Sequence, residues 1–169
     1  MQYFVYALDH TYTDDSRTES KRLGYFKNLE ELQKVKSKAV QLPGFKIFPE
    51  CFVIQKYILD KVNWKEGFTE VIGEIGRDYL ESGDEVDASI VSVKELGIES
   101  VFCLSHTYTL NTYLDDERFI GIFSGYEKAQ MVMNELKNKS GFKDFPNDFI
   151  LDEVELNAMH WTSGFYWEQ

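Results

Sequence analysis

Hydrophobic and polar positions along the first third of the chain predict four elements in a row. Residues 3–12 are aromatic and β-branched without a breaker, which predicts a strand. Residues 21–26 predict a second strand, and apolar residues at helical spacing from Leu29 to Ala39 predict a helix. Gly44 and Pro49 interrupt the chain, and residues 52–59 predict a third strand. The predicted order is ββαβ.

The second half of the chain repeats this pattern. Residues 5–13 and 101–109 are identical at six of nine positions at an offset of 96, and residues 24–68 and 121–165 at fifteen of 45 positions at an offset of 97. The shared residues include uncommon ones, such as the Trp-x-x-Gly-Phe that ends each stretch. Such self-similarity predicts a tandem duplication of one ββαβ unit.

Both helices have a polar residue where an N-cap is expected. Asn28 precedes Glu31 by three positions, and Ser124 precedes Glu127 in the same way, which is typical of a capping box. The two pairs differ in register by one position between the copies.

The order of elements restricts the topology. A hairpin pairs the first two strands, and the helix crosses back, so the first strand is expected in the centre of each sheet. One three-stranded sheet with one helix is thin and marginal by itself. We therefore expect an α+β fold in which the copies form a pseudo-twofold, mostly antiparallel assembly of six strands and two main helices, rather than two independent beads.

The acidic residues are unevenly distributed and suggest three ranges. Residues 1–68 form the first copy with net charge +2, residues 69–100 an acidic linker or insert with net charge −7, and residues 101–169 the second copy with net charge −6. The run Glu81–Asp87 is expected to be a flexible, solvated stretch.

Composition excludes several classes of protein. The net charge of −11 argues against nucleic-acid binding, and the 43% hydrophobic and 15% aromatic content argues against disorder. No apolar run is long enough for a membrane span, and the start of the chain lacks a signal peptide. Cys51 and Cys103 have apolar neighbours, so we expect reduced core thiols and a cytoplasmic protein.

The repeated His-Thr-Tyr-Thr is the first candidate site. His10 and Tyr12 share one strand face, as do His106 and Tyr108, and each histidine lies where an apolar strand runs out into a loop. A histidine there can serve as base, metal ligand or pH switch, and symmetric pairing would bring both to one cleft. A buried histidine that caps the sheet end through hydrogen bonds is the favoured alternative.

Trp64 and Trp161, each followed by Gly and Phe, are the second candidate. The aromatic tail can line a ligand pocket or an interface, but a lid over the core is favoured. Loop carboxylates at Asp14–Asp15 and Asp115–Glu117 are the third, and their spacing fits no calcium loop. No zinc spacing, phosphate loop or nucleophile motif occurs, so we expect no metal, no cofactor and no catalytic residue.

The second copy resembles a known family. His106-Thr107-Tyr108, Ile120-Gly121-Ile122-Phe123, Gly141-Phe142, Phe145-Pro146 and Trp161-Thr162-Ser163-Gly164-Phe165 together are similar to a small bacterial domain of unknown function. That domain typically occurs as a single copy, and the first half of the chain resembles it more weakly. The resemblance implies domain limits and no activity.

Three functions remain open from the sequence. The leading hypothesis is a non-enzymatic binding protein that recognises a protein partner or a small ligand. One version is an immunity-type protein that neutralises a basic toxin by charge complementarity. The second is an enzyme or metal-dependent site between the copies that uses His10 and His106. The third is a structural or regulatory domain that forms a homodimer through a sheet edge.

Overall fold

The computed structural model describes residues 1–15, 17–65, 89–111 and 114–165. Its contacts divide the chain into two compact units. Unit 1 contains Met1–Tyr57, Tyr79–Glu99 and Glu155–Gln169, and unit 2 contains Ile58–Asp78 and Ser100–Val154. Each unit therefore takes a terminal piece from the other half of the chain, and the ranges expected from the sequence stay a prediction.

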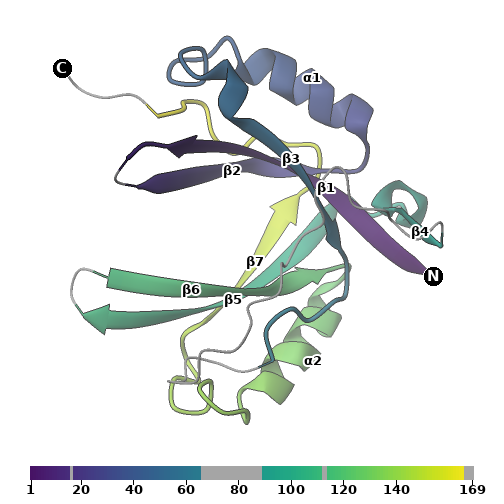
Figure 1. Cartoon of the computed structure of the whole chain (residues 1–169). Coiled ribbons are helices and arrows are strands. Elements are labelled where there is room, and N and C mark those ends of the chain that lie inside the picture. The colour runs from purple at the N-terminus through teal and green to yellow at the C-terminus, as the bar shows by residue number, and fades with distance from the viewer. Residues whose placement is uncertain (16, 66–88, 112–113, 166–169) are drawn as a thin grey trace. The chain divides into compact units, whose positions relative to one another are not determined.

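Unit 1 has one helix on a four-stranded sheet (Figure 1). Strand β1 (Gln2–Thr13) lies between β2 (Thr18–Phe26) and β3 (Phe52–Ile58), and β4 (Ile90–Ser92) pairs with β1 in parallel. Helix α1 spans Leu29–Ala39, and the 3-10 turns η1 and η2 span Pro49–Cys51 and Val93–Leu96. The pairing of β1 with β2 is antiparallel.

Unit 2 has one helix on a three-stranded sheet. Strand β5 (Ser100–Asn111) lies between β6 (Leu114–Phe123) and β7 (Phe149–Glu155), and helix α2 spans Tyr126–Leu136. The β5–β6 pairing is antiparallel. The chain thus has the predicted α+β class, with its strands in two mostly antiparallel sheets.

Several local predictions are confirmed. The first strand of each half is central, as the crossover requires, and α1 spans the predicted Leu29–Ala39. The expectation of six strands missed β4, a three-residue strand in the range assigned to the linker. The acidic run 81–87 lies outside the described residues.

The capping prediction is right for one helix and wrong for the other. Asn28 is the N-cap of α1, and its side chain accepts a hydrogen bond from the Glu31 amide at 2.9 Å. The N-cap of α2 is Gly125, which has no side chain to accept one. The Ser124 hydroxyl is instead hydrogen bonded to the Asp60 carboxylate, so it is unavailable as a cap.

Both cores lie between the helix and the sheet. In unit 1 the buried cluster contains Leu8, Leu23, Phe26, Leu32, Ala39 and Phe45, and Met159 packs against it. In unit 2 it contains Leu104, Ile120, Phe123, Ala129, Leu136 and Phe142, with Val62 and Trp64 against it. The segment after β7 thus completes the first core, and the segment after β3 completes the second.

Two further findings concern membrane-spanning helices and the cysteines. No helix in the described part of the chain is long and apolar enough to cross a bilayer. Among the described residues Cys51 and Cys103 form no disulfide, and each is half-buried rather than within a core cluster. Burial and, to a smaller extent, the nearby Glu50 carboxylate raise the pKa of Cys51.

Candidate functional site

His10 is enclosed in the core of unit 1. Its imidazole is 0% exposed and has edge-to-face contacts with Phe45 and Phe52, at centroid distances of 4.9 and 4.8 Å. Nε2 donates a hydrogen bond to the Phe48 carbonyl at 2.8 Å. Nδ1 is buried with no hydrogen-bond partner in the described part of the chain, so the ring is held as the neutral Nε2–H tautomer.

The electrostatic surroundings keep His10 neutral. Burial lowers the pKa of His10 and is the largest influence on it. The Phe48 hydrogen bond and the Glu50 carboxylate act in the opposite direction, while Lys21 lowers the pKa further. The lowered pKa favours the neutral form of a ring that has no contact with solvent.

His106 occupies the matching position in unit 2. Its imidazole is also 0% exposed, and Nε2 donates to the Phe145 carbonyl at 2.8 Å. Phe142 and Phe149 lie edge-to-face on it at 5.0 and 4.6 Å. The two histidines lie in different units, and each is enclosed by its own unit's aromatic side chains.

The tyrosines two positions further on are half-buried at the ends of the same strands. Tyr12 packs on Phe48 at a centroid distance of 4.7 Å, and Tyr108 packs on Phe145 at 4.6 Å. Both therefore cover the loop whose carbonyl the histidine binds. These contacts continue the aromatic core and leave the tyrosines partly open to solvent.

Trp161 is held against Lys21 at the surface of unit 1. The Lys21 ammonium lies 4.6 Å from the centre of the Trp161 ring and 4.8 Å from that of Phe165. The same ammonium donates hydrogen bonds to the carbonyls of Ser163 and Gly164, at 3.4 and 3.2 Å. The indole is 44% exposed, so the segment is fixed by backbone and cation–π contacts rather than by burial of the Trp ring.

Trp64 is held in a similar way in unit 2. The Arg118 guanidinium lies 4.3 Å from the centre of its ring, and the indole packs on the unit 2 core. In the strand registers His106 pairs with Arg118 as His10 pairs with Lys21. The predicted site residues therefore fall into two separate sets, one in each unit. Each set contacts one end of the sheet and the segment that follows β7 in unit 1 or β3 in unit 2.

A charged cluster in unit 1 was not predicted. The Arg22 guanidinium forms a two-pronged ion pair with the Asp9 carboxylate and donates to the hydroxyls of Tyr25 and Tyr57, at 2.6 and 2.7 Å. Burial by itself would lower the pKa of Arg22, but Tyr25, Asp9 and Tyr57 more than offset it, so the pKa lies well above its ordinary value. The cluster is a satisfied structural network.

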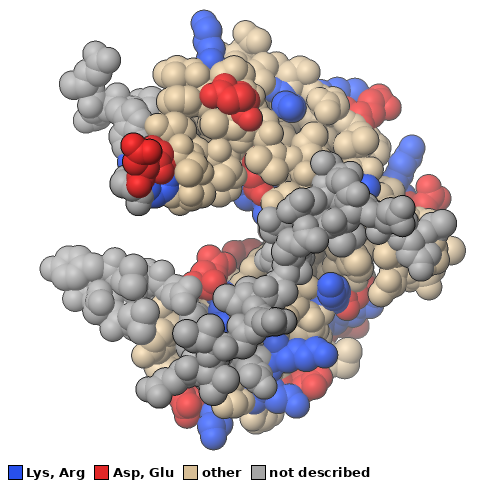
Figure 2. All heavy atoms as spheres, viewed as in Figure 1, with Lys and Arg blue, Asp and Glu red and all other residues tan. Residues whose placement is uncertain are grey.

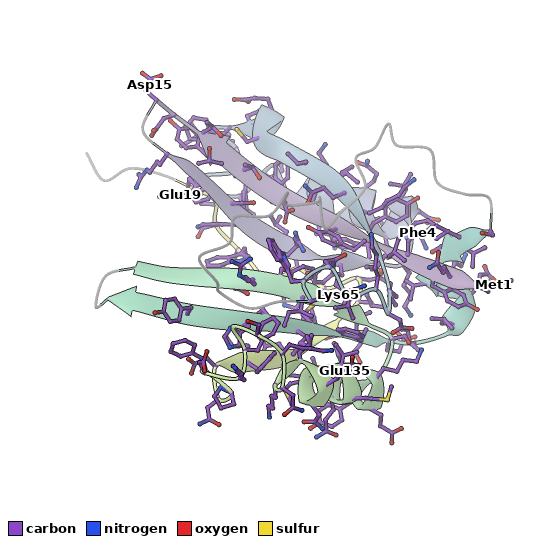
Figure 3. All side chains as sticks on the ribbon, turned by 60° about the horizontal axis from the view of Figure 1, so that its bottom comes forward. Met1, Phe4, Asp15, Glu19, Lys65 and Glu135 are labelled. Atoms are coloured by element: carbon purple, nitrogen blue, oxygen red, sulfur yellow. The ribbon has the colours of Figure 1, made fainter. Side chains whose placement is uncertain are left out.

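Unit 2 also contains a pocket that sequence reasoning missed. It has a volume of about 460 Å³ and lies between the C-terminal end of α2 and the segment after β3. Its apolar lining comes from Val62, Val132 and Leu136, and its polar lining from Lys65, Glu135, Lys139 and Ser140. Figure 3 labels Lys65 and Glu135, which belong to the segment and to the helix. The volume is in the range typical of small-molecule sites.

Comparison of positions 97 residues apart explains this pocket. Lys139 corresponds to Leu42 and Val62 to Met159, and both of those larger apolar side chains pack on the core of unit 1. In unit 2 the shorter Val62 and the exposed Lys139 line the pocket instead. A position-by-position comparison of the halves would have identified these residues.

The structure describes only some of the loop carboxylates. Asp14 accepts a hydrogen bond from the Arg17 amide at 3.1 Å, and the side chains of Asp115 and Asp116 lie outside the described residues. Within 1–15, 17–65, 89–111 and 114–165, no group of three His, Cys, Asp or Glu side chains is arranged to hold a metal ion.

The fold and these contacts define two α+β units, each completed by a segment from the other half of the chain. A family model described as a domain of unknown function (DUF7336) matches residues 99–165, the second half of the chain. No curated protein matches the chain. No solved structure matches it either.

Proposed function

We propose that the chain is a tandem duplication of the ββαβ domain that the family model describes. The repeated residues support this, and so do repeated contacts. In unit 1 the Asn157 amide donates to the Tyr25 carbonyl at 2.7 Å, and in unit 2 the Asp60 amide donates to the Ile122 carbonyl at 2.8 Å. The two donors are 97 positions apart in the sequence, and so are the two acceptors. A shared origin accounts for identical backbone contacts at one constant offset.

We propose further that the protein is a non-enzymatic binding protein whose ligand site is the pocket of unit 2. The observation that carries this proposal is the difference between the duplicated positions. Leu42 and Met159 pack on the core of unit 1, while Lys139 and Val62 line the pocket of unit 2 and place a cation at its rim. Unit 2 therefore offers a cavity with polar groups at its edge, at positions where unit 1 has larger apolar side chains.

The lining favours a small amphipathic carboxylate. The charged lining consists of two lysines, Lys65 and Lys139, and one carboxylate, Glu135, and the rest of the lining is largely aliphatic. A carboxylate head group would pair with the ammonium groups while its tail covers the apolar wall. A basic protein partner is less well supported, because the face in Figure 2 carries interspersed acidic and basic side chains on its described residues rather than a field of one sign.

A titration of the ¹⁵N-labelled full chain with octanoate tests the proposal. We expect octanoate to shift the amide signals of the pocket residues, and octylammonium at the same concentration to leave them unchanged. The variant V62M/K139L, which installs the residues of unit 1, is expected to lose at least about tenfold in affinity, as the loss of one charge-assisted hydrogen bond implies.

The matched control is K143L, which removes an exposed lysine outside the pocket. It is expected to bind octanoate as the unaltered chain does. Absence of any octanoate shift, or equal binding by V62M/K139L, would contradict the assignment of the site.

A further inference from the structure

The edge strand of each sheet has a bulge at the same place. In the β1–β2 ladder Leu8 pairs with Gly24 and Asp9 with Arg22, which leaves Leu23 as an extra residue. In the β5–β6 ladder Leu104 pairs with Gly121 and Ser105 with Phe119, which leaves Ile120. A bulged edge strand presents carbonyl groups that its own sheet does not satisfy.

The segment from the other half of the chain satisfies these carbonyls in unit 1. The amides of Asn157 and His160 donate to the Tyr25 and Leu23 carbonyls, at 2.7 and 2.8 Å. The Asn157 side chain also accepts from the Lys27 amide at 3.0 Å. Figure 1 shows this yellow segment beside β2.

Unit 2 has the same arrangement with the segment after β3. The amides of Asp60 and Asn63 donate to the Ile122 and Ile120 carbonyls, both at 2.8 Å. The Asp60 carboxylate accepts from the Ser124 amide at 2.9 Å. Asp60 and Asn157 both have positive φ, 58° and 63°, so each segment turns onto its edge strand with the same backbone conformation.

Glycines allow this close approach. A Cβ atom at Gly24 would overlap the Ala158 carbonyl oxygen, and one at Gly121 would overlap the Lys61 carbonyl oxygen. Further along the chain, the Gly164 amide donates to the Pro43 carbonyl at 2.8 Å, and a Cβ atom at Gly164 would lie 2.5 Å from the Phe45 nitrogen. Each edge strand is thus approached closely by backbone rather than by a side chain.

We infer that the two halves of the chain are mutual binding partners, each of which closes its sheet edge with a segment of the other. The 157–165 segment closes the edge at β2 in unit 1, and the 60–65 segment closes the edge at β6 in unit 2. This is strand addition at a sheet edge, in which backbone hydrogen bonds supply affinity and the flanking aromatic contacts supply register. Separation of the halves would expose both edges and open both cores, because Met159, Val62 and Trp64 would leave.

The test is cleavage of the full chain at a protease recognition sequence inserted after Gly83. We expect the two fragments to elute together from a sizing column under native conditions and to separate in urea. We also expect dissociation and unfolding to coincide in one transition whose midpoint rises with protein concentration, since neither half is complete alone. Fragments that separate while each stays folded would overturn the inference.

The variant G24A/G121A distinguishes segment exchange from ordinary adhesion between the units. We expect its cleaved fragments to separate at concentrations at which the unaltered fragments stay together. The control is G125A, because a Cβ atom at Gly125 meets nothing within 4 Å. Co-elution of the cleaved G24A/G121A fragments as tightly as those of G125A would contradict the inference.

Discussion

Replacement of Arg22 by Phe or Asp9 by Ser should reveal a strongly coupled pair in unit 1. The Asp9 side chain is 7% exposed and that of Arg22 30%, so loss of either leaves its partner largely enclosed. Breaking a buried ion pair from one side costs about 3–5 kcal/mol, and the partial exposure of Arg22 places each single variant near 3 kcal/mol, roughly the lower end. Phe119 and Ser105 are the corresponding residues of unit 2, so both substitutions are compatible with this fold.

The double variant D9S/R22F should cost less than the sum of the two single variants by about 1–3 kcal/mol, because no charge is left buried without a partner. Some cost remains, since the hydroxyls of Tyr25 and Tyr57 lose their guanidinium donor. Urea unfolding followed by far-ultraviolet circular dichroism at pH 7 measures all three. Simple additivity of the single variants, or a cost for R22F below about 1 kcal/mol, would refute this reasoning. The control R17A removes an exposed ion pair with Glu19 and should cost less than about 1 kcal/mol.

Three further predictions follow from the same contacts. Because burial holds the pKa of His10 below its ordinary value of 6.5, the unfolded chain takes up the proton first, so the contribution of His10 to stability is complete above about pH 6.5 and falls below it. The variant H10Q, which keeps a donor for the Phe48 carbonyl, should make the free energy of unfolding depend less on pH in this acid range. Urea titrations at several pH values measure this, and an unchanged pH dependence would contradict the prediction. G164A should lower the free energy of unfolding by about 1–3 kcal/mol, because its Cβ meets backbone at Phe45, whereas a loss as small as that of G125A would show that the close approach relaxes freely. Refolding at high protein concentration should yield dimers in which the 60–65 and 157–165 segments are exchanged between two chains, and light scattering that finds only monomer would argue against this.

The helices and main strands could be predicted from the sequence because the spacing of apolar residues and the positions of Gly, Pro and capping residues indicate the same elements in both halves. The apolar spacing from Leu29 to Ala39 predicted α1 to the residue, and Asn28 marked its start. Gly44 and Gly141, expected as left-handed caps after the helices, do have φ of +80° and +79°, but the C-caps of α1 and α2 are Val40 and Lys137. The central position of the first strand followed from the ββαβ order alone.

The sequence did not predict how each unit is assembled, because this depends on which of the two sheet edges the segments after β3 and β7 contact. The pattern that predicted Trp64 and Trp161 as a lid is the same whether the segment covers its own sheet or the other. Ser124 was misassigned as a cap for the same reason, because its partner Asp60 is distant in sequence and belongs to the segment that docks there. Short β4 has too few residues to show a period.

The predicted site residues were found in aromatic clusters, but their roles depend on enclosure that a sequence pattern does not reveal. His10 and His106 look alike whether they line a cleft or a core, and only the packing of Phe45, Phe52, Phe142 and Phe149 distinguishes these. The pocket was missed because its signal is a difference between the halves, at Lys139 and Leu42, whereas the repeat was found by identity.

Hydrogen exchange of four backbone amides tests segment exchange most directly. Protection is expected at Asp60, Asn63, Asn157 and His160, whose amides are bonded to the edge strands. G24A should remove protection at Asn157 and His160, in the other half of the chain, and leave Asp60 and Asn63 protected. G121A should do the reverse. If G24A instead exposed Asp60 and Asn63, each segment would dock on its own half, and the central claim would be wrong.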